Sequence, residues 1–201
     1  MSSAALAGKP RKRFTPEEYL LLERSALEKS EYYDGEIFAM AGALEAHNIV
    51  AANALATLLP LLRSRGCQTF GSDMKVGVTP QGPFFYPDVM VACGARKFLN
   101  GPRDTLLNPT IVVEVLSKST QRFDRAIKVK EYQRIASVNA VLLISADHAS
   151  VEVHTRSGRA WQQQNVTGLE KFVEIASPRC ILPLAEIYQG VDLRPQPKAI
   201  Q

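Results

Sequence analysis

Apolar and polar residues repeat along this chain with two periods, and these periods predict a mixed α/β domain. Segments 44–65 and 122–136 carry apolar residues at helical spacing, whereas segments 84–92, 110–116 and 140–145 are short and almost fully apolar. Short apolar runs are typical of strands that are buried on both faces of a sheet. We therefore expect a central sheet flanked by helices, with segment 110–116 near its middle.

Capping and turn residues mark where the N-terminal elements begin. Thr15, Pro16 and Glu18 fit the N-cap, first and third positions of a helix. The dipeptide Asp34-Gly35 follows, and its tolerance of positive φ angles predicts a tight β-hairpin. The N-terminal part should therefore add a helix and a hairpin to the central sheet.

The long helix and the C-terminal third carry signals of their own. Gly66 is a natural stop for the long helix, and Pro60 should kink that helix or end its regular part. Segments 151–166 and 171–182 each predict two short strands around a turn. The expected fold class is α/β, with a mixed β-sheet flanked by helices and with extra N-terminal and C-terminal β-hairpins.

Length and composition predict a single globular domain over residues 14–193. The chain has 201 residues, of which 46% are hydrophobic, and its formal net charge is only +4. Residues 1–13 form a basic arm and residues 194–201 a tail, and we expect both to be flexible. The arm is either a solubilising extension or a phosphate contact, because charge alone does not establish nucleic-acid binding.

Membrane and export signals are not expected from the sequence. No run approaches the roughly 18 consecutive apolar residues of a membrane span, and the first residues lack the pattern of a signal peptide. Cys67, Cys93 and Cys180 are odd in number and have no CxxC spacing. We therefore expect a cytoplasmic protein with buried free thiols, rather than a disulfide framework or a zinc site.

Two acidic residues lie in or beside apolar runs, where an ionised carboxylate is costly unless it is paired or bound to a cation. Asp88 lies at the beginning of an apolar run that follows Pro87, and Glu114 interrupts segment 110–116. If the two strands are neighbours, both carboxylates can converge on one hard cation. The alternatives are that Asp88 caps a turn and that Glu114 pairs with a buried arginine.

A lysine on the following helix completes this constellation. With about 100° of rotation per residue, Lys128 falls on the apolar face beside Tyr132, whereas Lys130 falls on the solvated face. Asp124 lies one turn before Lys128 and could orient it. An ammonium group beside metal-bound carboxylates can orient water and neutralise phosphate charge. The alternative is that Lys128 only pairs with Glu114 or Asp124.

These residues resemble a known group of nucleases. The Asp followed by an apolar strand with Glu is similar to the core pattern of the PD-(D/E)XK nuclease superfamily. The full ordered set is similar, more narrowly, to the Uma-two family, a bacterial group described as restriction endonucleases. The motifs, spread over about residues 14–193, are residues 31–36, Ala46-His47-Asn48, Tyr86-Pro87-Asp88-Val89, residues 113–120, and Asp124 with Lys128 and Tyr132.

The resemblance implies a restriction-endonuclease-like core with a metal site. It implies that Asp88, Glu114 and the backbone carbonyl of Val115 hold Mg²⁺ or Mn²⁺. It also implies that Glu31 is an additional acid near the metal and that His47 lies in the wall of the site. The alternatives are that Glu31 is a solvent-facing acid before a hairpin and that His47 is an ordinary hydrogen-bonded histidine.

One departure from the superfamily pattern concerns its lysine. Leu116 occupies the position where the superfamily has that lysine. In the Uma-two family the lysine has moved to the following helix, which again indicates Lys128. If the move is misread, the site binds metal without cutting a substrate.

The expected function is that of a metal-dependent endodeoxyribonuclease that hydrolyses phosphodiester bonds of DNA. The competing classes are a catalytically inactive nucleic-acid-binding or scaffold protein with the same fold, and a hydrolase of another phosphoester. No Gly-rich phosphate loop, HExxH helix or Ser-His-Asp motif points elsewhere. Because cutting both strands of a duplex requires two sites, we also expect a homodimer.

Overall fold

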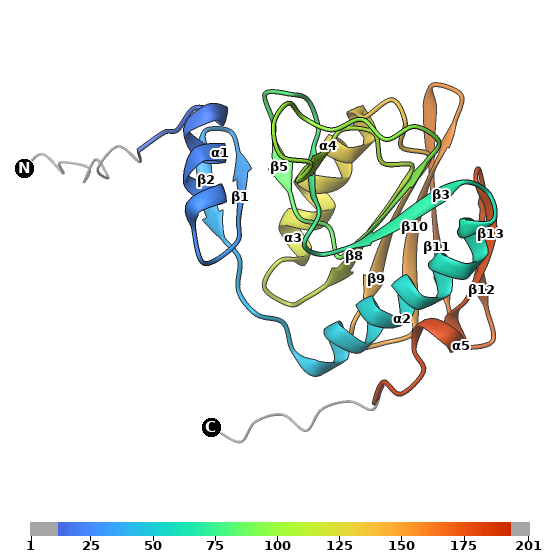
Figure 1. Cartoon of the computed structure of the whole chain (residues 1–201). Coiled ribbons are helices and arrows are strands. Elements are labelled where there is room, and N and C mark those ends of the chain that lie inside the picture. Colours follow the sequence, from blue (N-terminus) through green and yellow to red (C-terminus); the bar gives the residue numbers. More distant parts are fainter. Residues whose placement is uncertain (1–11, 194–201) are drawn as a thin grey trace, which may run out of the picture.

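The computed structural model describes residues 12–193, and Figure 1 shows how its elements are arranged. The helical elements are α1 (Pro16–Ser25), α2 (Glu45–Arg63), α3 (Gln121–Phe123), the π-helical turn η1 (Asp124–Lys128), α4 (Val129–Arg134) and α5 (Leu184–Ile187). The strands are β1 (Ser30–Tyr33), β2 (Glu36–Ala39), β3 (Cys67–Gly71), β4 (Lys75–Gly77), β5 (Phe84–Phe85), β6 (Val89–Cys93), β7 (Thr105–Leu106), β8 (Ile111–Leu116), β9 (Ala140–Ser145), β10 (Ser150–Ser157), β11 (Ala160–Thr167), β12 (Phe172–Ala176) and β13 (Arg179–Pro183).

A six-stranded sheet with the order β11-β10-β9-β8-β6-β3 forms the centre of the molecule. β8 lies inside this sheet and is buried along its whole length, as the sequence predicts. β8 and β9 are parallel and are connected through α3, η1 and α4, whereas the other neighbouring strands are antiparallel. The sheet is therefore mixed, and the predicted α/β class is confirmed.

Helices cover both faces of the central sheet (Figure 1), and alternate side chains of β8 enter two different cores. Val113 and Val115 belong to a core that includes α2 and the β12–β13 hairpin. Val112 and Leu116 belong to a second core that includes α4. Because side chains alternate along a strand, Glu114 lies on the same face as Val112 and Leu116. This alternation directs the Glu114 carboxylate towards α4.

The first hairpin belongs to a second sheet with the order β2-β1-β5-β4-β7, and α1 packs against this sheet. The ring of Tyr19 stacks on those of Tyr32 and Phe84 at centroid distances of 5.1 and 5.6 Å and joins α1 to this sheet. Asp34 and Gly35 have φ angles of 46° and 78°, as the predicted primed turn requires. The pairing of β1 with β5 and the ring contacts with α1 connect the first hairpin to the rest of the protein.

The predicted start of α1 is confirmed in detail. The Thr15 side chain accepts a hydrogen bond from the Glu18 N–H, and the Glu18 carboxylate accepts one from the Thr15 N–H. Pro16 lies at the first helical position. These contacts satisfy backbone donors that have no partner within the helix.

The strand that we expected over residues 84–92 is two strands in two different sheets. β5 pairs with β1 and β4, whereas β6 pairs with β3 and β8. Pro87 lies between them; it has no N–H for a strand ladder, and its ring restricts Tyr86. The break places Asp88 where the chain passes from one sheet to the other.

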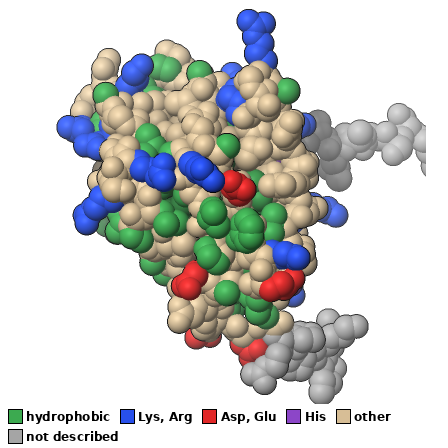
Figure 2. Space-filling view, turned by 90° about the vertical axis from the view of Figure 1, so that its right-hand side faces the viewer, with side chains coloured by type: hydrophobic (Ala, Val, Ile, Leu, Met, Phe, Trp, Pro, Cys, Tyr) green, Lys and Arg blue, Asp and Glu red, His purple; other side chains and the backbone are tan. Residues whose placement is uncertain are grey.

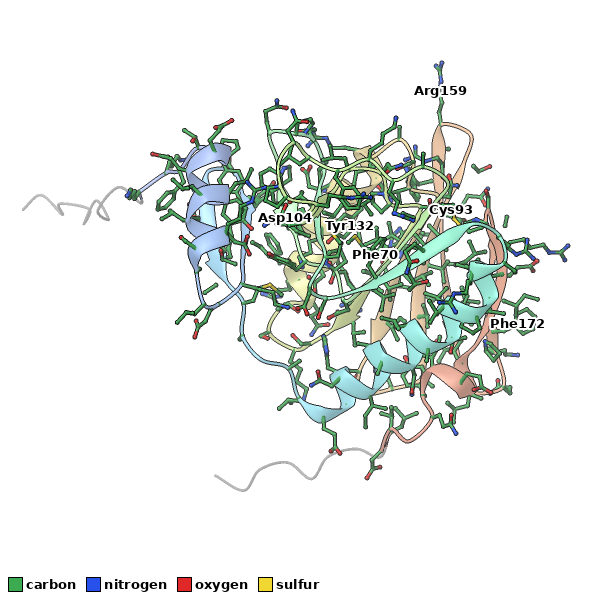
Figure 3. The ribbon with its side chains drawn as sticks, in the orientation of Figure 1. Phe70, Cys93, Asp104, Tyr132, Arg159 and Phe172 are labelled. Carbon is green, nitrogen blue, oxygen red and sulfur yellow. A yellow bond between two sulfur atoms is a disulfide. The ribbon has the colours of Figure 1, made fainter. Side chains whose placement is uncertain are left out.

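The expectation of three free thiols is wrong. Cys67 and Cys93 are opposed on the antiparallel strands β3 and β6 and form a disulfide, whereas Cys180 is free and buried. Figure 3 shows Cys93 at one end of the sheet. The 26-residue separation between the bonded cysteines gives no sequence signal; only the pairing of their strands brings them together.

Two helices differ from their predicted form. α2 continues for three residues beyond Pro60 to Arg63, so this proline does not end the helix. The predicted helix over residues 122–136 contains the π turn η1, in which the Val129 N–H donates to the Asp124 carbonyl. Single π turns occur frequently at functional sites, and this one carries Lys128.

The ends of the predicted domain fall at the limits of the described residues. Arg13 lies 3.4 Å from the Asp34 carboxylate at the tip of the first hairpin. The rest of the basic arm up to Arg11, and the tail from 194 to 201, lie outside the described residues. Within residues 12–193 no helix combines the length and the apolar character needed to cross a membrane. The cytoplasmic location and the domain limits stay predictions.

Candidate active site

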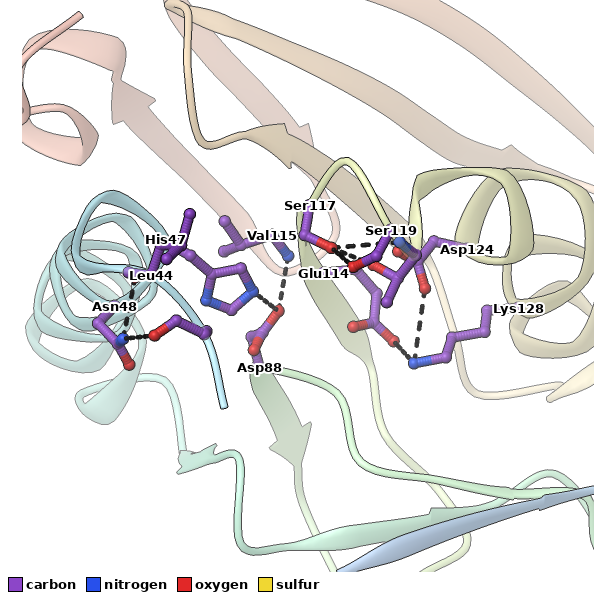
Figure 4. Close-up of polar contacts among 12 residues, drawn as sticks. Leu44, His47, Asn48, Asp88, Glu114, Val115, Ser117, Ser119, Asp124 and Lys128 are labelled. Carbon is purple, nitrogen blue, oxygen red and sulfur yellow. Dashed lines mark hydrogen bonds and ion pairs between the residues drawn. The ribbon is translucent and has the colours of Figure 1, made fainter. Parts of the chain in front are cut away.

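The pairing of β6 with β8 brings the two predicted acids together. Val89 is paired with Val113, and one step further along the ladder Asp88 comes level with Glu114. The Oδ2 atom of Asp88 accepts a hydrogen bond of 2.7 Å from the Val115 N–H, which fixes the carboxylate against β8. Figure 4 shows Asp88 and Glu114 side by side at this point. The sequence-based expectation of neighbouring strands is confirmed.

Glu114 is buried and its Oε1 atom has two donors from the helical segment. Lys128 Nζ lies 3.2 Å from Oε1, and the Tyr132 hydroxyl donates to the same atom at 2.5 Å. Figure 3 shows Tyr132 in the interior of the molecule. Both donors lie on the face predicted from helical phase, even though Lys128 ends the π turn η1 and Tyr132 lies in α4. Lys130 is exposed, as predicted.

Glu31 reaches the same lysine from the second sheet. Its Oε1 atom accepts hydrogen bonds from Lys128 Nζ at 2.8 Å and from the Tyr86 N–H at 2.9 Å. Asp124, one turn before the lysine, lies 3.6 Å from Nζ. Glu31 is therefore buried and bound to Lys128, so the alternative of a solvent-facing acid is wrong; its role near a metal stays a prediction. The break after β5 supplies the Tyr86 N–H that holds it.

Acidic groups outnumber cations in this cluster, and the pKa values of Glu114, Asp124 and Lys128 are all raised. Burial raises the pKa of Glu114 well above its usual range, and Lys128 only partly opposes that shift. Burial also raises the pKa of Asp124. Burial alone would lower the pKa of Lys128, but Glu114, Glu31 and Asp124 outweigh it and raise the pKa. Lys128 is thus a fixed positive charge among acids that lack enough compensation.

His47 lies on the first turn of α2 and faces Asp88. Its Nε2 atom is 3.4 Å from Asp88 Oδ2, and 15% of its side chain is exposed. Burial lowers the pKa of His47, but Asp88 and the Val115 carbonyl together raise it above its usual value. Its Nδ1 atom is buried and has no hydrogen-bond partner among the described residues. His47 therefore lies beside Asp88 and the Val115 backbone, and its place in the wall of a functional site stays a prediction.

The donor set suits a hard divalent cation. Asp88 Oδ1 and Glu114 Oε2 accept no hydrogen bond from the described residues, and the free oxygen of Glu114 is turned towards Asp88 (Figure 4). Carboxylate and carbonyl oxygens are the ligands that Mg²⁺ prefers. No three His, Cys, Asp or Glu side chains within residues 12–193 form a ready metal-binding group. The fit rests on two carboxylates and the Val115 carbonyl.

Sequence reasoning missed a second buried cluster close to this site. Lys75 is buried, and its ammonium group binds the carboxylate of Glu23 and lies 3.4 Å from the Tyr86 hydroxyl. The Tyr86 hydroxyl also donates to Glu23. A lysine within the apolar segment 74–79 was the signal that could have revealed this cluster.

Depressions elsewhere on the surface do not coincide with these acids. One groove lies between α2, β13 and α5 and is lined in part by Leu61, Ile181 and Pro183. Figure 2 shows the side of the molecule that carries β13, where apolar side chains mix with scattered lysines and arginines. The lining of the groove contains one acidic side chain, that of Glu186, and no basic side chain. The acid cluster between α2 and η1 therefore stays the best candidate for chemistry.

The central sheet, with acids on adjacent strands and a lysine from the crossover helix, defines a nuclease-like α/β fold. A crystal structure described as a "putative nuclease belonging to DUF820", from Anabaena variabilis ATCC 29413, superposes on this chain with a TM-score of 0.71. The two sequences are 17% identical, and the superposition covers 87% of this chain and 97% of the other. At that identity the likeness concerns the fold.

Sequence comparison then gives the family. The model of the Uma2 family, described as "Putative restriction endonuclease", matches residues 16–185. The protein sll1609 of Synechocystis sp., described as uncharacterized, is 36% identical over 167 residues, which is 82% of this chain and 94% of that protein. The protein slr1290 of the same organism, also described as uncharacterized, is 29% identical over 183 residues, or 90% and 95%. The chain belongs to the Uma2 family.

Proposed function

We propose that this protein is a metal-dependent endonuclease that hydrolyses phosphodiester bonds of DNA. One observation carries the proposal: Asp88 and Glu114 meet on adjacent strands beside the buried cation of Lys128, each with one carboxylate oxygen that accepts no hydrogen bond from residues 12–193. The family description and the fold of the similar crystal structure support a nuclease. DNA as substrate and the metal requirement belong to the proposal.

Asp88, Glu114 and the Val115 carbonyl would hold Mg²⁺ or Mn²⁺. When bound, such a cation supplies Lewis-acid activation of a water molecule and of the phosphate oxygens. Asp88 is already oriented for this role, because the Val115 N–H and His47 both contact its Oδ2 atom, and Oδ1 has no donor within the described part of the chain. His47 is therefore a positioning residue for Asp88.

Lys128 would place its positive charge against the scissile phosphate. Its ammonium group is held by Glu31 and Glu114, and the Tyr132 hydroxyl shares Glu114 Oε1 with it. These contacts keep Nζ at one location, and a preorganised charge in a site of low dielectric stabilises developing negative charge strongly. Glu31 acts as an anchor of Lys128, since its Oε1 atom already has two donors.

Substitution of the three principal residues tests the proposal. Asp88→Ala, Glu114→Ala and Lys128→Ala should each lower Mg²⁺-dependent cleavage of DNA about a hundredfold or more. Lys130→Ala is the matched control, because Lys130 is exposed on the same helix, and it should cleave like the wild type. Circular dichroism must show folded variants. Equal cleavage by the wild type and all three variants would disprove the assignment.

A homodimer is also part of the proposal. Cleavage of both strands of a duplex requires two sites, which a two-fold dimer supplies. Sedimentation of the wild type with and without a DNA duplex measures this directly. A monomer that cleaves only one strand per binding event would remove the dimer and leave the active site as proposed.

A further inference from the structure

Aromatic rings continue from the acid cluster to the protein surface. Phe85 lies beneath Lys128, whose Nζ is 5.6 Å from the ring centroid, and it contacts Phe123 at 6.3 Å. Phe123 in turn contacts Phe38 at a centroid distance of 5.8 Å. Phe38 is 38% exposed. A row of three rings therefore leads from the lysine to solvent.

The first hairpin and the helical crossover supply the outer two rings. Phe38 on β2 is the direct cross-strand partner of Glu31 on β1, so both side chains lie on the same face of the hairpin. Phe123 directly precedes Asp124 at the junction of α3 and η1. β2 and α3 are at the left and centre of Figure 1. The exposed ring of Phe38 is therefore one neighbour away from a residue that binds Lys128.

A single exposed phenylalanine needs no explanation by itself. Phe38 differs from such a residue because its ring contacts Phe123, which in turn contacts Phe85 beneath Lys128. Lys128 is the group that the proposed function places against the phosphate. Phe172 on β12 provides the contrast: it is 54% exposed and lies at the opposite edge of the molecule (Figure 3), away from the acid cluster. The two residues have the same chemistry and different surroundings.

We propose that Phe38, supported by Phe123, is a stacking platform for an unpaired nucleobase next to the scissile phosphate. A base within a duplex already has both faces stacked, whereas an unpaired base offers a free face to an aromatic side chain. The preferred substrate is then single-stranded or locally unpaired DNA. This inference rests on the proposed nuclease function and specifies its substrate.

Binding of labelled oligonucleotides tests the platform without cleavage. A single strand with one 2-aminopurine and the matching duplex are titrated with the wild type in Ca²⁺, which takes carboxylate ligands. We expect tighter binding of the single strand and a change in 2-aminopurine fluorescence. Phe38→Leu should weaken that binding about fivefold or more and remove the fluorescence change. Phe38→Trp should preserve both, and Phe172→Leu should bind like the wild type.

Each contrary outcome has a distinct meaning. If the wild type binds and cleaves DNA but Phe38→Leu binds the single strand equally well, the platform is disproved and the nuclease function stands. If Phe38→Leu instead changes the sedimentation coefficient and leaves DNA binding unchanged, Phe38 is a protein contact and the platform is again disproved. If the wild type binds neither DNA form, both proposals fail.

Discussion

Two buried lysines of this molecule belong to clusters that are joined by Tyr86, and the clusters differ in their balance of charge. Lys75 on β4 is 1% exposed and Lys128 on η1 is 6% exposed, so each must be compensated by acids. Among the described residues, Lys75 forms an ion pair with Glu23 and contacts the hydroxyl of Tyr86, while the nearby Asp104 is paired with Arg24. Lys128 has three carboxylates within 3.6 Å, with Asp88 beyond them. The first cluster is balanced in charge and the second is rich in acid.

Tyr86 connects the two clusters through different atoms. Burial raises the pKa of its hydroxyl, which therefore stays protonated and donates to Glu23. Its backbone N–H donates to Glu31 in the other cluster. The balanced cluster thereby joins α1 to β4 and holds in place the peptide group that orients Glu31.

The difference between the clusters distinguishes a structural ion pair from a site. In a balanced buried pair the two charges compensate each other, so no bound ion is needed to neutralise them. An excess of buried carboxylates is unfavourable until protons or a cation compensate it. Burial raises the pKa of Glu114, and the neighbouring acids add to this shift while Lys128 opposes it. Perturbed acids around one lysine are therefore typical of functional positions. Three predictions follow from the comparison, in decreasing order of expected effect.

Replacing each lysine by methionine should have the largest effect, because one substitution should lower catalytic activity and the other should lower the stability of the fold. Lys128→Met should lower cleavage about a hundredfold or more, because it removes the charge placed against the phosphate. Lys75→Met leaves the buried carboxylate of Glu23 unpaired and should lower the free energy of unfolding by about 3 kcal/mol. Activity per folded molecule of Lys75→Met should stay close to that of the wild type. Urea unfolding and cleavage assays measure the two quantities.

A second substitution checks the cause of the instability. Adding Glu23→Gln to Lys75→Met removes the unpaired charge and should recover part of the lost stability. If the double variant is no more stable than Lys75→Met, the loss comes from packing and not from charge. If Lys75→Met loses activity but keeps its stability, the two clusters are not distinct in the way that their charges indicate.

The main features of the acid-rich cluster were predictable because each leaves a mark in the sequence. Asp88 and Glu114 lie at or in apolar runs, and Lys128 lies on the apolar side of a helical pattern. Their strands pair and the lysine meets Glu114 as expected. The predicted helices and hairpins are present for the same reason: caps, turn residues and hydrophobic periods are local signals.

What was missed depends on contacts between distant segments. The disulfide between Cys67 and Cys93 requires β3 and β6 to pair in one register. The balanced cluster requires α1 to pack on β4, and no local pattern links Glu23 to Lys75. The break at Pro87 was visible, but its consequence was not, because the sequence does not show that the chain passes into a different sheet there.

The second prediction concerns the response to metal. A bound divalent cation stabilises the folded state, by about 2.7 kcal/mol at a concentration a hundred times the dissociation constant, so Mn²⁺ should raise Tm by several degrees. Asp88→Asn should remove this increase. Glu23→Gln should lower Tm itself but leave the increase intact, because that acid belongs to the balanced cluster. Thermal unfolding in Mn²⁺ and in EDTA measures the effect; an increase that persists in Asp88→Asn would locate the metal elsewhere.

The third prediction has the smallest effect and follows the balanced cluster to the surface. Arg24 binds the Asp104 carboxylate through two hydrogen bonds of 2.8 and 3.1 Å. The backbone carbonyl of Asp104 accepts a hydrogen bond from the Lys75 N–H, which joins this pair to the balanced cluster. Burial would raise the pKa of Asp104, but hydrogen bonds from Arg24 and Thr105 outweigh burial and lower it below its usual value of 3.8.

A lowered pKa in the folded state fixes the sign of the pH dependence. The stabilisation by Asp104 is present above its ordinary pKa and is lost as the pH falls through the lower, folded value. Since the pair is partly exposed, Asp104→Asn should cost less than about 1 kcal/mol at pH 7, and the difference from the wild type should shrink below about pH 4. Asp73→Asn is the control, because that side chain is 95% exposed and should change little at any pH. Urea unfolding across this range decides, and a difference that grows on acidification would show that Asp104 is not held as its anion.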